Sequence, residues 1–268
     1  MRETLTACTL ALLVTGCMVG PDYVRPVVDT PPAWRINESE ARDTANTAWW
    51  SQFGDPLLNT LIDEAVRENK DLLIASARID EYAGRLGVTR ADLFPQIGLG
   101  YDVARQRNTL PGTTTKGIYN SYDTLLSASW EIDLWGKLRR QDEAARAQLI
   151  ASEEGRRGVL LTLVSGVAGA YVNLRDLDRQ LEIASDTART REASYRLFQD
   201  RYAGGLISIL ELSQNKSQYD EALARIPALE QSIALQENAL SALLGRNPGP
   251  IARGKNIDEL SPPVIPEG

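Results

Sequence analysis

The side chains that most often carry out chemistry are scarce in this sequence. Histidine is absent from all 268 residues, and the only cysteines are Cys8 and Cys17. A Ser-His-Asp triad, a Cys-His pair and a zinc site built on histidine are therefore excluded. The cysteine spacing also excludes a CxxC metal or redox motif. These absences predict a protein that is not an enzyme and that holds no cofactor or metal.

Carboxylates are the remaining candidates for acid–base chemistry. Four of them lie on the polar side of two segments in which apolar and polar residues alternate: Asp102, Asp123, Glu131 and Asp133. No nucleophile motif accompanies them, so they are weak candidates for a catalytic pair. The formal net charge of −7 also argues against nucleic acid as a partner, because phosphate binding needs clustered Lys and Arg.

The residue that could be covalently modified is Cys17. Residues 1–16 contain an apolar stretch of roughly ten residues, which is too short to span a bilayer and is typical of a secretory signal. The stretch ends in Val14-Thr15-Gly16-Cys17, which resembles a bacterial lipoprotein box. We therefore predict a signal peptide over residues 1–16 and lipid attachment at Cys17, with Met18 in the next position favouring the outer membrane. An ordinary signal with a chance cysteine is the alternative.

The hydrophobic pattern predicts a mainly α-helical protein with one β-hairpin. Residues 17–54 are rich in proline and predict an extended tether, as do residues 248–268 at the other end. The elements expected between them are a helix over 55–94, strands over 96–107 and 119–134, and helices over 137–203 and 207–245.

Local signals support these helices. Asp55-Pro56 is typical of a helix start, because Asp caps free N–H groups and Pro is tolerated in the first turn. Residues 137–203 contain no proline, and their apolar positions alternate by three and four, which indicates a coiled-coil rod roughly 100 Å long. Gly204-Gly205 ends this rod. Pro227 predicts a kink in the following helix.

The two predicted strands alternate strictly. Ile97, Leu99, Tyr101 and Val103 share one face, and the second strand repeats the pattern with Leu125 as an exception. Each run is about as long as a tilted strand that crosses a bilayer. A membrane barrel and a soluble hairpin that covers a helix both give this alternation. The pattern alone leaves the two interpretations open.

Several ordered motifs then resemble one family, the TolC-type outer-membrane efflux factors in their lipoprotein (OprM/NodT-like) branch. The matching segments are Gly20-Pro21-Asp22-Tyr23, Trp49-Trp50 with Asp55-Pro56, Ala91-Asp92-Leu93-Phe94-Pro95-Gln96, Ser129-Trp130-Glu131-Ile132-Asp133-Leu134-Trp135-Gly136, Arg201-Tyr202 with Gly205, and Leu243-Leu244-Gly245. The resemblance implies an outer-membrane channel subunit of a tripartite efflux system, which is a passive exit duct for drugs or other toxic solutes.

The resemblance also implies an architecture. Family members have two repeats of two strands and a set of helices, and three chains close a twelve-stranded barrel. The helices continue as a periplasmic tube that meets an adaptor and an inner-membrane pump. Residues 55–247 then correspond to the first repeat.

The resemblance further implies roles for particular residues. Gly204, Gly205, Leu206 and Ser208 would form the periplasmic tip that contacts the adaptor. Glu211 would line the aperture, where carboxylate rings favour cations, and the four carboxylates named above would face the lumen. The alternatives are an ordinary helix-hairpin turn, a solvated helix charge and the wet side of a soluble hairpin.

The family's second repeat has no counterpart in the 268 residues. Three copies would supply six strands, and unpaired strand edges are costly in lipid. Either six copies assemble into a hexamer or the chain is a truncated product, and we expect truncation. A lipid-anchored periplasmic coiled-coil protein, structural or adaptor, is the alternative function.

Overall fold

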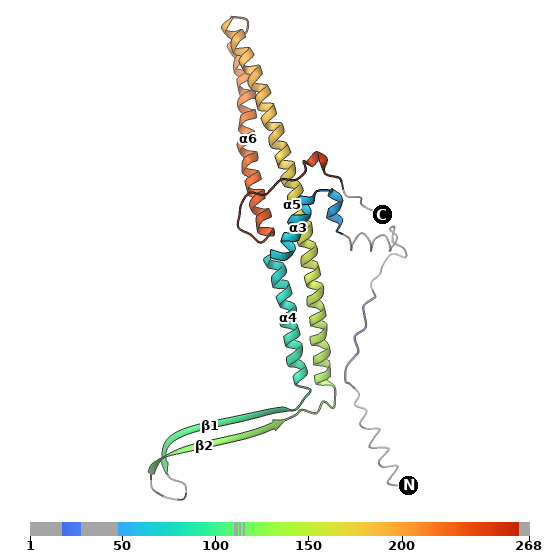
Figure 1. The fold of residues 1–268 in the computed structure, drawn as a ribbon, viewed down its shortest axis with the longest axis vertical. Helices are drawn as coiled ribbons and strands as arrows, with labels where there is room; N and C mark the ends of the chain where they lie inside the picture. Colours follow the sequence, from blue (N-terminus) through green and yellow to red (C-terminus); the bar gives the residue numbers. More distant parts are fainter. Residues whose placement is uncertain (1–17, 28–47, 110–111, 113, 115, 263–268) are drawn as a thin grey trace. The chain divides into compact units, whose positions relative to one another are not determined.

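The computed structural model describes residues 18–27, 48–109, 112, 114 and 116–262. Cys17 and the predicted signal peptide lie outside the described residues. The elements, shown in Figure 1, are η1 (Trp49–Phe53), α3 (Pro56–Glu68), α4 (Lys70–Ala91), β1 (Gln96–Thr109), β2 (Lys116–Ser129), α5 (Lys137–Ala203), α6 (Ile209–Leu243) and η2 (Ile257–Glu259). The mainly helical fold with one hairpin is the fold class that the sequence predicted.

The chain forms two compact units. One contains residues 76–155 together with the described residues before position 28, and the other contains residues 48–75 and 156–262 of the described chain. Helices α4 and α5 each contribute residues to both units.

The first unit contains the hairpin. β1 and β2 pair antiparallel from Gln96 opposite Ser129 to Thr109 opposite Lys116. The sequence predicted residues 119–134 for the second strand, but β2 covers Lys116–Ser129. The predicted end of the strand was therefore wrong. The alternation of apolar residues continues past Ser129, but β1 begins at Gln96, directly after Pro95, and offers no partner to the later residues.

The predicted helix over 55–94 is two helices, because Asn69 interrupts it. Asn69 has an extended backbone (ψ 128°) and ends α3. Its side-chain oxygen accepts a hydrogen bond from Leu72 N–H at 3.0 Å and so caps the start of α4. Its side-chain nitrogen donates to the Leu243 carbonyl at 2.9 Å. A single polar residue therefore ends one helix, starts the next and ties the break to α6.

The second unit contains the hydrophobic core. Helices α3, α5 and α6 bury apolar side chains together, including Leu58, Ile62, Val167, Leu174 and Leu240. Among the described helices, α5 alone contains a stretch long and apolar enough to cross a membrane by composition. A core helix of a soluble protein meets the same criterion, and α5 supplies much of this core. α6 continues as a helix through Pro227.

Candidate functional site

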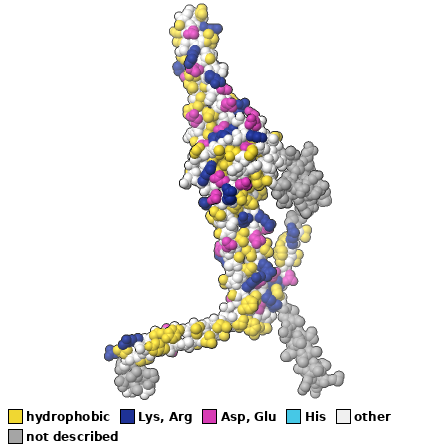
Figure 2. All heavy atoms as spheres, in the orientation of Figure 1, with side chains coloured by type: hydrophobic (Ala, Val, Ile, Leu, Met, Phe, Trp, Pro, Cys, Tyr) yellow, Lys and Arg dark blue, Asp and Glu magenta, His cyan; other side chains and the backbone are white. Residues whose placement is uncertain are grey.

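One face of the hairpin is apolar and exposed from Ile97 to Val103 of β1, and beyond Val103 the same face carries Arg105 and Arg107. The strand register places the predicted apolar residues of β1 opposite those of β2. Exposed fractions reach 76% for Ile97, 74% for Leu99 and 72% for Leu126. Figure 2 shows hydrophobic side chains spread along the hairpin. An apolar surface of this kind requires lipid or another protein to cover it.

The opposite face carries two of the predicted carboxylates. Asp102 and Asp123 are direct register partners, and the Ser121 hydroxyl donates to Asp123 at 2.8 Å. Like charges placed directly opposite repel each other in a sheet. Leu125 lies on this face opposite Gly100, so the exception seen in the sequence is retained in the structure. From Gln96 to Val103, the strand register therefore gives the hairpin one apolar face and one mainly polar face.

Glu131 and Asp133 lie beyond the end of β2 and belong to the junction with α5. Glu131 pairs with Lys137 at 3.1 Å. Asp133 accepts hydrogen bonds from the backbone N–H groups of Leu138 and Arg139 at 3.2 and 3.0 Å. Burial alone would raise the pKa of Asp133, but these N–H groups stabilise the charged carboxylate and lower the pKa overall. The four predicted carboxylates thus fall into two separate groups.

The turn between α5 and α6 contains the four predicted tip residues. Gly205 has a left-handed backbone (φ +70°), and Leu206 N–H donates to the Arg201 carbonyl at 2.9 Å. Gly205 N–H also donates to the Tyr202 carbonyl at 2.9 Å. The two hydrogen bonds form a Schellman motif, which satisfies carbonyls in the last turn of α5. Leu206 is 77% exposed, and sequence reasoning missed the exposed Ile209 and Leu210 beside it. Their position in the first turn of α6, outside its apolar seam, was the available signal.

Glu211 forms a capping box with Ser208. Its carboxylate accepts from Ser208 N–H at 2.8 Å and from the Ser208 hydroxyl at 2.9 Å, and its own N–H donates back to that hydroxyl. The Ser208 backbone N–H, followed by its hydroxyl, lowers the pKa of Glu211. The charge therefore helps to start α6. A lumen-facing role for Glu211 stays a prediction.

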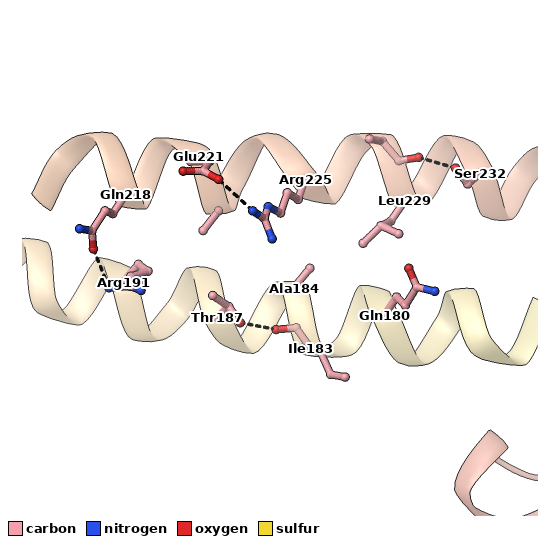
Figure 3. A pocket seen from close by; sticks show the side chains of 12 residues that line it. Gln180, Ile183, Ala184, Thr187, Arg191, Gln218, Glu221, Arg225, Leu229 and Ser232 are labelled. Atoms are coloured by element: carbon pink, nitrogen blue, oxygen red, sulfur yellow. Dashed lines mark hydrogen bonds and ion pairs between the residues drawn. The ribbon is translucent and has the colours of Figure 1, made fainter. Parts of the chain in front are cut away.

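A groove of about 590 Å³ separates α5 and α6 farther along the pair (Figure 3). Polar contacts occupy its sides: Arg191 donates to Gln218 at 2.7 Å, and Arg225 pairs with Glu221 at 2.8 Å. Glu221 is the carboxylate that lines the groove, and it is paired with Arg225. The groove therefore offers no free acid–base pair. Within the described parts of the chain, no group of three potential metal ligands occurs.

A buried polar cluster joins the segment after α6 to the helices. Asp55 accepts hydrogen bonds from the Tyr171 hydroxyl at 2.6 Å, from Lys255 N–H at 3.0 Å and from Leu57 N–H at 2.9 Å. Tyr171 in turn accepts from Gly254 N–H at 3.1 Å. The sequence identified Asp55 only as a helix cap. Its distant partners gave no local signal.

Charged residues surround this cluster. Arg175 is only 5% exposed and donates to the Lys255 carbonyl at 2.9 Å and to the Asn256 side chain at 2.6 Å. Arg253 pairs with Asp178 and Glu237. Burial would raise the pKa of Glu237, but Arg253 and the Ile251 N–H group lower it. We interpret these contacts as structural, because they all hold the segment after α6 in place.

The chain is similar to proteins of bacterial efflux systems and outer membranes, both in sequence and in structure. The chain is 32% identical to the cation efflux system protein CusC of Escherichia coli (strain K12) over 97% of its own length and 57% of CusC. It is 31% identical to the probable outer membrane lipoprotein SilC of Salmonella typhimurium, over 98% of this chain and 58% of SilC. A crystal structure of CusC superposes with a TM-score of 0.75 at 30% identity, covering 94% of this chain and 57% of that one.

The chain thus spans little more than half the length of these relatives. Residues 61–246, well over half of the chain, match the model of the family described as outer membrane efflux protein. The hairpin, the long helices and the sequence match agree, and the chain belongs to the outer membrane efflux protein family.

Proposed function

We propose that this chain supplies one repeat of an outer-membrane efflux channel, with the β1–β2 hairpin crossing the membrane as part of a barrel. The observation that carries the proposal is the exposed apolar face of the hairpin opposite a mainly polar face. Barrel strands in membranes have this arrangement, with apolar residues toward lipid and polar residues toward the lumen. Asp102 and Asp123 would then face the lumen.

Strand length supports the same proposal. Each strand has 14 residues, which is more than the roughly 9–11 residues that a tilted strand needs to cross a membrane. Arg105 and Arg107, near the far end of β1, would then lie outside the hydrocarbon core. The hydrocarbon core of a bilayer is about 30 Å thick. The outer edges of β1 and β2 need hydrogen-bonding partners in lipid. Further strands must therefore join this hairpin, and a trimer of the family type or an assembly of more copies would supply them.

The N-terminus would be held by lipid. The box that ends in Cys17 supports removal of residues 1–16 and acylation of the cysteine, and the name of SilC describes that relative as a probable outer membrane lipoprotein. Each buried CH₂ group of an acyl chain contributes about 0.8 kcal/mol to membrane binding. Outer-membrane localisation with helices in the periplasm follows from this arrangement.

The remaining parts of the proposal concern partners and solute. The α5–α6 turn, with Gly204, Gly205, Leu206 and Ser208, would contact a periplasmic adaptor that links the channel to an inner-membrane pump. Glu211 would contribute negative charge near the aperture. The name of CusC describes cation efflux, and carboxylate rings favour cations. Toxic cations are therefore the first solutes to test.

The test measures the native mass and the ion conductance of the chain extracted from outer membranes in detergent. A discrete oligomer that conducts in a planar bilayer is the expected result. A species without conductance that stays fully soluble after Cys17→Ser would refute the channel and favour a lipid-anchored coiled-coil protein.

Neighbouring residues on opposite faces of β2 provide a matched pair of variants. Leu126→Lys places a charge on the lipid side, where it costs about 2–4 kcal/mol at the bilayer midplane, and we expect recovery of membrane-inserted protein to fall steeply. Ser127→Lys places the same charge on the lumen side and should be tolerated. Equal recovery of the two variants would contradict the assigned faces.

A further inference from the structure

The described N-terminal residues 18–22, here called the strap, lie against the junction between β2 and α5. Val19 N–H donates to the Trp135 carbonyl at 3.0 Å. The Arg140 guanidinium donates to the Gly20 carbonyl at 3.2 Å and to the Asp22 carboxylate at 2.7 Å. Three hydrogen bonds from one short segment to one junction indicate a defined seat for the strap.

Gly136 provides the space for this seat. Its backbone is left-handed (φ +79°), and a Cβ atom built there would lie 2.5 Å from Met18 Cγ and 3.1 Å from Met18 Cα. Any other residue would therefore be strained and would also collide with the strap. Gly136 is itself buried, and its carbonyl accepts from Arg140 N–H at 2.9 Å in the first turn of α5.

Arg140 is held ready for the strap by α5 itself. Glu143, one turn along the helix, pairs with the guanidinium at 2.7 Å. The Arg140 side chain is 23% exposed, whereas the Asp22 side chain is 88% exposed. Hydrogen bonds to Asp22 and Glu143 raise the pKa of Arg140, which stays charged. The helix side of the contact is therefore preorganised, and the strap side is an exposed segment that binds to it.

The junction also presents two exposed tryptophans. Trp130 is 58% exposed, and its indole N–H donates to the Leu93 carbonyl at 3.2 Å, just before β1 begins. Trp135 is 69% exposed and supplies the carbonyl that binds the strap. Tryptophan is enriched at membrane–water interfaces, where its ring lies at the level of the headgroups. The strap therefore binds next to two tryptophans that favour the level of the lipid headgroups.

We propose that Gly136 and Arg140 form a docking site for the strap, which holds an acylated N-terminus beside Trp130 and Trp135 at the membrane surface. The proposal rests on the lipidation and membrane insertion described above. Because consecutive Cα atoms are about 3.8 Å apart, a lipid on the residue before Met18 starts next to the docking site. The acyl chains and the hairpin then bind the bilayer as linked sites with a short connection, so each raises the local concentration of the other at the membrane.

Docking is tested in the full chain, with Cys8 and Cys17 both replaced by Ser and a single nitroxide on Tyr23→Cys. Tyr23 is 78% exposed, so the label does not disturb packing. In detergent we expect a restricted spectrum. Arg140→Ala should raise the mobile component roughly threefold to tenfold, the range for loss of one or two weak hydrogen bonds. Asp22→Ala, a change on the exposed strap that leaves the fold intact, should give an intermediate rise.

Arg146→Ala is the matched control, because this arginine of α5 pairs with Asp142 and not with the strap. Identical spectra for the parent and Arg140→Ala, or the same rise with Arg146→Ala, would overturn the docking site. The acyl mass on Cys17 of the otherwise unmodified chain is measured separately, so a failure of lipidation is distinguishable from a failure of docking.

The anchoring role needs a second readout in the chain with its natural cysteines. We expect Arg140→Ala to lower the fraction of chain that resists protease as membrane-inserted hairpin, and Arg146→Ala to leave it unchanged. Loss of docking with unchanged insertion would overturn the role of the site in holding the anchor.

Discussion

Tyr171→Phe removes one oxygen atom from the centre of the buried polar cluster and leaves the aromatic ring in place. That oxygen donates to Asp55 at 2.6 Å and accepts from Gly254 N–H at 3.1 Å. Both Tyr171 and Asp55 are almost completely buried. The substitution therefore tests whether this cluster fastens the segment after α6 to the helical unit.

The magnitude follows from the two lost bonds. A hydrogen bond to a charged group contributes about 1.5–3 kcal/mol, and an N–H group left buried without a partner costs about 1–3 kcal/mol. Asp55 keeps its bonds from Leu57 and Lys255, and the costs of two lost bonds to one atom do not add in full. We therefore expect detachment of the segment after α6 to become easier by about 2–4 kcal/mol.

Trypsin cleavage after Arg253 and Lys255 provides the assay, because both residues lie in the segment that the cluster holds. When opening is fast relative to cleavage, the rate follows the population of the open form. A change of 2–4 kcal/mol corresponds to a rate increase of roughly thirtyfold or more. Tyr195→Phe is the control, since Tyr195 stacks on Tyr219 in the same helix pair, away from the cluster. A rate within about twofold of the parent would refute the reasoning.

The stabilisation by Tyr171 should also depend on pH. Burial first, and then the hydrogen bond to Asp55, raises the pKa of Tyr171 to about 12 from the ordinary value of 10.0. A raised folded-state pKa means that the neutral hydroxyl stabilises the fold below pH 10 and that this contribution is lost as pH rises toward 12. The stability difference between the parent and Tyr171→Phe, measured by circular dichroism, should be constant from about pH 6 to 9 and shrink above pH 10.

Three further changes have defined outcomes. Gly254→Ala places a Cβ atom inside contact distance of the Asp55 carboxylate, so the same trypsin assay should show destabilisation of about 1–3 kcal/mol, and an unchanged rate would contradict the close contact. Ser208→Ala should destabilise the first turn of α6 by about 1 kcal/mol, seen as faster amide exchange there and not in α3. Asn69→Ala should lower the thermal midpoint, because it uncaps α4 and leaves the Leu243 carbonyl without its donor; an equal midpoint would show that the break does not depend on Asn69.

Local signals account for the parts of the fold that the sequence predicted well. Helix α5 covers residues 137–203, as expected from the absence of proline, the apolar seam and the Gly204-Gly205 stop. The alternation along the strands gave the correct faces, since side chains in a strand alternate with a period of two. Membership in a family of channels also confirms the prediction that the chain is not an enzyme.

The parts that were missed depend on residues far apart in the sequence. Asn69 contacts a carbonyl 174 positions away, and Tyr171 contacts Asp55 at a separation of 116. Apolar periodicity resumes after Glu68 and Asn69 and continues to the end of α4, so the periodicity did not separate the two helices; Asn69, a preferred cap residue, was the available local signal. The end of β2 was missed for a related reason, because the alternation does not reveal where the partner strand begins. Pairing and capping across long separations are properties of the fold that no single segment displays.

Apolar side chains are buried in the helical unit and exposed on the hairpin, and this contrast favours the proposed membrane strands over a soluble hairpin. In the helical unit, Leu58, Ile62 and Leu174 are completely buried. A soluble hairpin that covers a helix would bury one face in the same manner. Instead, Ile97 and Leu99 are exposed by about three quarters of their surface. They belong to a continuous row of apolar residues on one face of the hairpin and are not isolated surface residues. Such a face marks a surface that binds lipid or another protein, and 14-residue strands are long enough to cross a bilayer, so the proposal assigns lipid as the covering.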